Sequence, residues 1–259
     1  MPHILPFKSI YNIRDFGGYA GHDGRQLKDG LLFRSAQLSN ISDRELPDFE
    51  GLGLKTIIDM RYLAERKKQP SRFPDNFDGQ ILSYGHKKVV DDEQQYAPHE
   101  VFLYKELVSA DAARQYMMSS YTERPADAGF IKLCQEGFEA MAQKGDPLLV
   151  HCAADKDRTG TFVALIQHLL GMSEEDIFAD YMLTEKAVNI DQLVQRSAPY
   201  FTQKYNRDYS PEMLRPMFGT HEDYLAASFK TMGDRDIYIE KILGITSEKK
   251  AVIAANYLM

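Results

Sequence analysis

A short polar stretch, HCAADKDRTG at 151–160, separates two apolar segments near the middle of the chain. The segment before it, 146–153, is rich in Leu and Val and ends in polar residues, as a buried strand of a helix-flanked sheet does. The segment after it carries apolar residues at helical spacing. This order predicts a strand, a tight loop and a helix, which is the repeating unit of an α/β fold with parallel strands.

Other segments extend the same pattern. A second buried strand is expected at 53–60, weaker strands at 31–39 and 79–85, and an amphipathic helix over 128–143. From 173 onward nearly everything has helical periodicity, so 173–259 is expected to wrap the core as helices. The polar segment 85–127 has no evident strand, and we interpret it as an insert that could act as a lid.

Length and composition describe one ordinary globular domain spanning 1–259. The chain has 259 residues, and no internal repeat or Pro/Gly/Ser linker divides it. A net charge of −7 argues against nucleic acid as a partner, and the longest apolar stretches are too short for stable membrane insertion. With only two cysteines and no evident signal peptide, the expected compartment is the cytoplasm, with export by another route left open.

The loop at 152–158 has the residues of an anion site. Backbone N–H groups at a helix N-terminus bind anions and favour a thiolate over a thiol, so Cys152 is expected to be an activated nucleophile. Arg158 supplies a planar fork that matches two phosphate oxygens, and Thr159 can hydrogen-bond the cysteine sulfur. A cysteine, five residues, an arginine and a threonine in this context indicate phosphoryl transfer through a cysteinyl-phosphate intermediate. The residues expected to hold a phosphate ion are Ala153, Ala154, Asp155, Lys156, Asp157 and Arg158.

Each cysteine also has a simpler interpretation. Cys152 could be a small buried hydrophobic residue, but the charged residues that follow it argue against this. Cys134 lies on the apolar face of its predicted helix and is expected to be core. His151 could ligate a metal, yet no second ligand lies at the right spacing in the sequence. We therefore expect the His151 imidazole to hydrogen-bond the loop backbone. We expect no metal or cofactor to be required.

The sequence resembles a known family at these residues. HCAADKDRTG resembles the HCxxGKDRTG loop of bacterial tyrosine phosphatases that also act on phosphoserine and phosphoinositides, a branch of the cysteine-dependent phosphatases. NIRDFGGY at 12–19, LFRSAQLS at 32–39 and IIDMRYLAERKKQP at 57–70 are similar to other segments of that family. The resemblance spans nearly the whole chain except 85–127. It implies a cysteine-phosphatase-like α/β fold and phosphate-monoester hydrolysis without metal.

The resemblance also implies roles for individual residues. Cys152 matches the nucleophile, Arg158 the phosphate-binding arginine, and Asp157 the candidate general acid that protonates the leaving oxygen. The absence of tryptophan speaks against an acid on a separate Trp-Pro-Asp loop and supports Asp157. The alternative for Asp157 is a salt bridge to an arginine behind the loop. Lys156 matches a lysine that can meet further phosphates of an inositol ring, or it is a solvated charge.

Asp155 departs from the family pattern, which has glycine at this position. Glycine suits a loop position with a left-handed backbone or with little room for a side chain, and Asp tolerates the left-handed conformation better than most residues. A carboxylate beside the pocket would repel a phosphate dianion, so Asp155 could weaken catalysis, narrow the substrate range or simply point at solvent. If it disables the loop, the protein would be a phospho-ligand binding module and not an enzyme.

Three further residues could support the loop. Asp59 and Arg61 follow a predicted strand, at the edge where parallel sheets place their sites, although Arg61 is equally explained by an i, i+4 pair with Glu65. Asp15 is expected to pair with Arg14 and brace the loop. Together the residues predict a protein-tyrosine phosphatase acting on phosphotyrosine protein, with phosphoserine and phosphothreonine as further substrates. The alternatives are a phosphoinositide phosphatase and the binding module.

Overall fold

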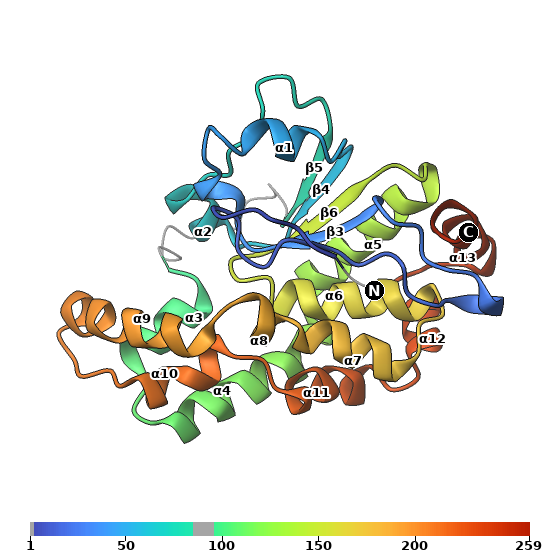
Figure 1. The fold of residues 1–259 in the computed structure, drawn as a ribbon. Coiled ribbons are helices and arrows are strands. Elements are labelled where there is room, and N and C mark those ends of the chain that lie inside the picture. The colour runs from blue at the N-terminus through green and yellow to red at the C-terminus, as the bar shows by residue number, and fades with distance from the viewer. Residues whose placement is uncertain (1–2, 85–95) are drawn as a thin grey trace.

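The core is one six-stranded sheet with strand order β1-β2-β3-β6-β4-β5 (Figure 1). The computed structural model describes residues 3–84 and 96–259. The central strands β3, β6, β4 and β5 are parallel, and β1 and β2 add an antiparallel edge. The strands are β1 (His3–Ile4), β2 (Arg14–Asp15), β3 (Leu32–Ser35), β4 (Thr56–Asp59), β5 (Gln80–Ser83) and β6 (Leu148–His151). The α/β class with a parallel core and all four predicted strands are confirmed.

Helices pack around the sheet. Those of the described residues are α1 (Leu46–Glu50), α2 (Leu63–Lys68), α3 (Pro98–Lys105), α4 (Ala110–Glu123), α5 (Ala128–Gln143), α6 (Asp157–Leu169), α7 (Glu174–Met182), α8 (Thr184–Ala187), α9 (Ile190–Tyr205), α10 (Pro211–Phe218), α11 (Glu222–Met232), α12 (Arg235–Ile237) and α13 (Ser247–Tyr257). A π-helical turn, Tyr238–Ile242, follows α12, and short 3-10 segments lie at His22–Gly24, Leu38–Asn40 and Arg124–Ala126. The predicted helix at 128–143 coincides with α5, and the predicted helical C-terminal third is α7 to α13.

The two faces of the sheet contribute to separate cores because successive strand residues point to opposite faces. Leu148 and Val150 of β6 belong to a large core that includes residues of α5, α6, α11 and α13. Leu149 lies between them in sequence but joins a smaller core with Phe33 and Phe49, on the side of α1. This arrangement buries β6 on both faces, so the loop that follows β6 starts from a rigid support.

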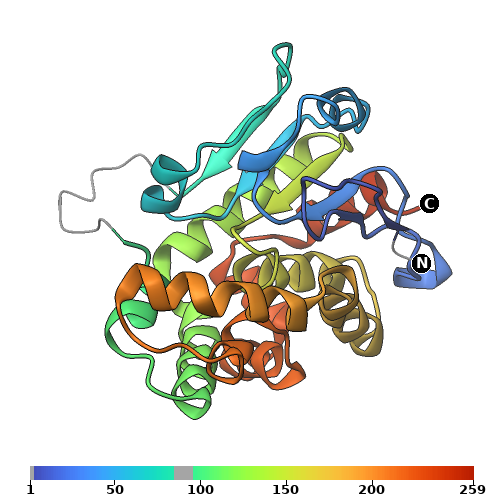
Figure 2. The same cartoon turned by 60° about the vertical axis from the view of Figure 1, so that its left-hand side comes forward.

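A third cluster of apolar side chains is made by α3, α4, α9 and α10. These helices come from distant parts of the chain, yet they form one group, green and orange in Figure 2, next to the carboxyl ends of the strands. The described part of the predicted insert, 96–127, is therefore helical, and its helices pack on the C-terminal third. Residues 85–95 of that insert lie outside the described residues.

Side-chain caps begin several of the helices. The Ser173 hydroxyl accepts a hydrogen bond from the Asp176 N–H at the start of α7, and the Thr246 hydroxyl accepts one from the Lys249 N–H at the start of α13.

Among the helices of residues 3–84 and 96–259, none has the length and apolar character that a membrane span requires.

Candidate active site

The loop 152–156 connects the carboxyl end of β6 to the N-terminus of α6. Parallel α/β sheets place ligand sites at this edge. The first turn of α6 leaves its N–H groups without partners inside the helix, which gives the loop a partial positive charge and donors for an anion. The predicted strand, loop and helix are therefore present around Cys152.

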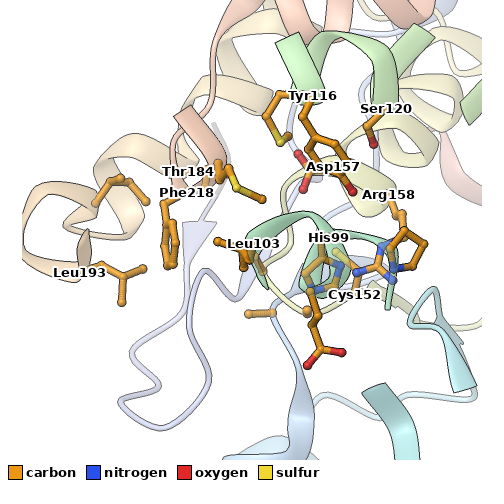
Figure 3. A pocket seen from close by; sticks show the side chains of 18 of the residues that line it. His99, Leu103, Tyr116, Ser120, Cys152, Asp157, Arg158, Thr184, Leu193 and Phe218 are labelled. Carbon is orange, nitrogen blue, oxygen red and sulfur yellow. The ribbon is translucent and has the colours of Figure 1, made fainter. Parts of the chain in front are cut away.

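Cys152 lies on the wall of a cavity of about 910 Å³. Its side chain is buried among its neighbours, and both it and Cys134 are free thiols. Ala153, Ala154, Asp157 and Arg158 line the same cavity. In Figure 3 the side chains of Cys152, Asp157, Arg158 and His99 occupy one part of the cavity, and Leu193 and Phe218 another. Cys134 is part of the core, as expected.

Arg158 is held by a carboxylate from α2. Its Nη1 donates to Glu65 Oε2 at 2.6 Å and to the Met60 carbonyl at 3.0 Å, and its Nη2 donates to Glu65 Oε1 at 2.9 Å. The guanidinium also lies 4.7 Å from the centre of the Tyr62 ring. Burial acts to raise the pKa of Glu65, but the charge and hydrogen bonds of Arg158 outweigh it and lower that pKa. The pair is therefore ionised, and its geometry fixes the direction of the Arg158 fork.

Asp157 lines the cavity and is ionised in the unliganded protein. Burial acts to raise the pKa of Asp157, but the charges of Lys156 and Arg124 outweigh it and lower that pKa. Its Oδ1 lies 3.4 Å from Lys156 Nζ and has no hydrogen-bond partner among the described residues. No salt bridge joins it to an arginine within the described residues, so that alternative is wrong and the paired cation is Lys156.

Lys156 is buried and not solvated, contrary to one of its two interpretations. Its Nζ donates a hydrogen bond to the Met217 carbonyl, and burial lowers the pKa of Lys156. Its ammonium group is thus directed at α10, a helix of the third apolar cluster. It is not among the residues that line the cavity.

Asp155 has a left-handed backbone, with φ of 53°, which is one of the two reasons why glycine would suit this position. Its side chain is fully buried, so the interpretation that it points at solvent is wrong. The carboxylate accepts hydrogen bonds from Arg34 Nε at 2.9 Å and from Arg14 Nη1 at 3.2 Å. Asp155 does not line the cavity, so the carboxylate is directed behind the loop and not at a bound phosphate.

His151, Asp59 and Arg61 lie together behind the loop. Because Asp59 pairs with His151 in the register of β4 and β6, its Oδ2 lies 3.5 Å from His151 Nε2. Neither ring nitrogen has a hydrogen bond of regular geometry among the described residues, although the backbone of Cys152 acts to raise the pKa of His151. Burial lowers the pKa of His151. Arg61 donates to both carboxylate oxygens of Asp59, and the expected pair with Glu65 is not formed because Arg61 precedes α2.

Two more expectations differ from the structure. The Thr159 hydroxyl is buried and has no partner among the described residues, so it does not bond the cysteine sulfur. Asp15 does not pair with Arg14: it accepts hydrogen bonds from the Gly17 and Gly30 N–H groups at 2.8 and 2.5 Å. Arg14 and Asp15 are consecutive residues of β2, and consecutive strand side chains point to opposite faces.

The sequence interpretation missed two residues of this site. Glu65 was assigned to a local pair with Arg61, although it orients Arg158. His99 of α3 lines the cavity, with its Nε2 3.9 Å from Glu65 Oε1, and burial lowers the pKa of His99. Only spatial proximity connects either residue with the loop, because they are 93 and 59 positions from Arg158 in the sequence. The described residues contain no cluster of three or more His, Cys, Asp or Glu placed to hold a metal ion.

A cysteine at the end of a buried parallel strand, followed by an anion-binding turn and an arginine on the next helix, is the arrangement of the cysteine-dependent phosphatases. Comparison with known proteins identifies the family of this chain. A model of the tyrosine phosphatase family matches residues 5–259, and the chain belongs to this family. The predicted enzyme class, a protein-tyrosine phosphatase and thus a hydrolase, is confirmed.

Named relatives cover most of the chain. The triple specificity protein phosphatase PtpB of Mycobacterium tuberculosis is 29% identical over 255 residues, covering 89% of this chain and 89% of PtpB. A Cupriavidus necator protein that carries the provisional name of a tyrosine-protein phosphatase is 28% identical, covering 94% of this chain and 85% of its own length. A tyrosine-protein phosphatase of Nostoc commune is 26% identical over 58% of this chain and 47% of its own length.

Proposed function

We propose that this chain hydrolyses phosphotyrosine in proteins through a phosphate ester on Cys152. The observation that carries the proposal is the position of the cysteine: it lies on the cavity wall, at the carboxyl end of β6, with Arg158 in the first turn of α6. In the first step the Cys152 sulfur attacks phosphorus, the S–P bond forms, and the bond between phosphorus and the tyrosine oxygen breaks.

Arg158 has donors left for the phosphate. A guanidinium has five N–H donors. Within the described residues, three of them are used by Glu65 and Met60, which leaves the Nε–H and one Nη2–H. These two hydrogens lie on one edge of the planar group, the edge that binds two oxygens of a phosphate side by side. Glu65 is therefore the residue that turns this edge toward the cavity.

We assign Asp157 as the general acid of the first step and the general base of the second step. The leaving tyrosine oxygen takes a proton from the Asp157 carboxyl, and in the second step the carboxylate accepts a proton from the water that attacks phosphorus and releases phosphate from Cys152. The carboxyl must be protonated when substrate is bound. A phosphate dianion beside it raises its pKa, in opposition to Lys156 and Arg124.

The cavity favours a long aromatic substrate side chain. Tyr62, Tyr84 and Tyr116 line it, and α3, α4, α9 and α10 form its outer walls. The name of the relative PtpB indicates activity on more than one kind of substrate, so we include phosphoserine and phosphothreonine for this chain. The phosphoinositide alternative rested on Lys156, which is turned to Met217, although Arg196 and Lys204 also line the cavity. The binding-module alternative rested on repulsion by Asp155, whose carboxylate is instead bound by two arginines.

We also propose that 1–259 is one domain, in which α3 and α4 close the cavity as a lid. One core cluster extends from Phe16 to Leu258, which supports a single folding unit.

The cytoplasm stays our proposal for the compartment, and the two free thiols agree with a reducing environment. Cell fractionation with an antibody to the chain tests this assignment, and recovery in culture medium would overturn it.

Phosphate release tests the function. The parent protein is incubated with a phosphotyrosine peptide, a phosphoserine peptide and vesicles that contain a phosphorylated phosphatidylinositol. We expect the fastest release from phosphotyrosine and none from Cys152→Ser. Cys134→Ser is the matched control, because it changes the other free thiol, which lies in the core, and it should keep activity. Fastest release from the vesicles would make the phosphoinositide alternative the function, and binding of the peptide without turnover would support the binding module.

A further inference from the structure

Asp155 makes two sets of contacts behind the loop, of which only the carboxylate bonds to Arg34 and Arg14 are beyond the reach of a glycine. Besides the two bonds to its carboxylate, its backbone carbonyl accepts hydrogen bonds from Arg34 Nη2 and Asn12 Nδ2, each at 3.1 Å. Asn12 also donates to the Thr184 hydroxyl at 3.0 Å, and Thr184 lines the cavity. The middle of the phosphate loop is thus tied to the sheet edge and to α8 through one residue.

The arginines that hold Asp155 are also held by a second carboxylate. Asp180 of α7 accepts from Arg14 Nε at 3.2 Å and from Arg34 Nη1 at 2.8 Å. All four side chains are buried. Asp180 therefore bridges both guanidinium groups by itself, and the cluster of two arginines keeps an anionic partner without Asp155. Asp180 balances only one of the two arginine charges, and in this chain the second carboxylate comes from the phosphate loop itself. The charge balance of the buried cluster is thereby coupled to the position of the loop.

We propose that Asp155 is a positioning residue, whose carboxylate pulls the middle of the loop onto Arg34 and Arg14 and so keeps the loop N–H groups aimed at the bound phosphate. The inference rests on the proposed function, because it assigns a role in the anion site that hydrolysis would use. Residue 155 is a glycine in the family pattern and an aspartate in this chain. We expect replacement of Asp155 by glycine to weaken anion binding by the loop.

The ionisation of Asp155 supports the same role. Burial raises the pKa of Asp155 to about 6, although Arg34 and Arg14 act in the opposite direction. The charged groups that face the carboxylate are Arg14 from β2, Arg34 from β3 and Asp180 from α7. Acidification through this range protonates the carboxylate and weakens its attraction to the arginines. Anion binding in the loop should then become weaker at lower pH, whereas a protein that merely gains positive charge binds anions more tightly.

Sulfate is the probe, because its charge stays constant over this pH range. Affinity is measured by calorimetry in the Cys152→Ser background, with Asp155→Asn, Asp155→Gly and Asp180→Asn added separately, at about pH 7.5 and about pH 5. At the higher pH we expect Asp155→Asn and Asp155→Gly to lose about 10- to 100-fold in affinity, the order of loss that misplaced groups cause. The background protein should lose affinity on acidification, and Asp155→Asn should not.

Asp180→Asn is the matched control, because it removes a carboxylate from the same arginines but from α7 and not from the loop. It should lower the melting temperature, since the pKa of Asp180 is lowered despite burial and its ionised form is thus favoured by folding. Its loss of sulfate affinity should be smaller than that of Asp155→Asn. Unchanged affinity in both Asp155 variants, or losses that simply follow melting temperature across all variants, would overturn the proposal. Sulfate binding that depends on Asp155 in a parent protein that releases no phosphate would remove the proposed function and leave this inference standing.

Discussion

Glu65 and Arg158 form a two-point ion pair, with Nη1–Oε2 and Nη2–Oε1 distances of 2.6 and 2.9 Å, and both side chains are buried. The pair joins α2 to the first turn of α6 and sets which edge of the guanidinium faces the cavity. A buried pair with this geometry has a cost of desolvation that its attraction must offset, and the loss of one partner leaves the other charge uncompensated. The pair therefore serves orientation of Arg158 as well as stability.

We predict that Glu65→Gln lowers kcat/KM for a phosphotyrosine peptide by about 10- to 100-fold, because the Arg158 fork loses its direction.

The same substitution, Glu65→Gln, should lower the free energy of unfolding by about 3 kcal/mol at neutral pH. The pKa of Glu65 is depressed in the fold, so this stability is present above the unfolded pKa and is lost as pH falls through the folded pKa. Glu139→Gln removes an exposed partner of Lys249 and is the control, for which the expected stability change is within about 1 kcal/mol. Equal activity of Glu65→Gln and parent would contradict the orienting role.

Asp157→Asn should act through the leaving group. We expect kcat/KM to fall by about 100-fold or more for a phosphotyrosine peptide, whose oxygen needs a proton to leave. For an aryl phosphate with an acidic phenol the loss should be much smaller. Because the pKa of Asp157 is lowered in the unliganded protein, kcat/KM of the parent should rise as pH falls toward that pKa, and Asp157→Asn should remove this dependence. Equal losses for both leaving groups would show that Asp157 is not the acid.

Asp155→Asn should not destabilise the fold at neutral pH. The folded pKa of Asp155 is raised to about 6 by burial, against the attraction of Arg34 and Arg14, so between its unfolded pKa and about 6 the folded state binds more protons. Its contribution to stability is therefore present at low pH and lost as pH rises through this window. Denaturant unfolding of parent and Asp155→Asn should show the parent losing stability relative to the variant from about pH 4 to about pH 7. A parent that gains relative stability as pH rises would contradict this ionisation.

Lys156→Met separates the two substrate assignments. Lys156 is buried and bonded to the Met217 carbonyl, so its loss should lower turnover of a phosphotyrosine peptide and of a phosphorylated phosphatidylinositol by the same factor. The ratio of the two kcat/KM values is the measurement. A selective loss on the phosphoinositide would mean that Lys156 turns into the cavity when that substrate binds.

Local patterns in the sequence predicted the helices and strands that follow from short-range apolar periodicity. Helix α5 coincides with the predicted 128–143, and the strand before Cys152 and the helix after it follow from apolar periodicity. The errors came from treating sequence neighbours as partners. Arg14 and Asp15 are adjacent in a strand and therefore point apart, and Arg61 is not helical, so the i, i+4 rule does not join it to Glu65.

The rest of the candidate site depends on contacts between distant segments. Asp155 binds Arg34 and Arg14, which are 121 and 141 residues away, and no single-sequence pattern predicts such pairing. The sequence did show that Asp155 was unusual, and one of the two reasons for glycine at that position, a left-handed backbone, is present. It did not indicate where the carboxylate points, because that direction is set by the buried arginines of β2 and β3.

Transfer of the phosphate to Cys152 can be observed by trapping the phosphorylated enzyme. The parent protein is mixed with a phosphotyrosine peptide, quenched in acid within one turnover, digested and mapped by mass spectrometry. We expect one phosphate on the peptide that contains Cys152 and none on the peptide that contains Cys134. Continued release of phosphate with no phosphate on Cys152 at any quench time would contradict it.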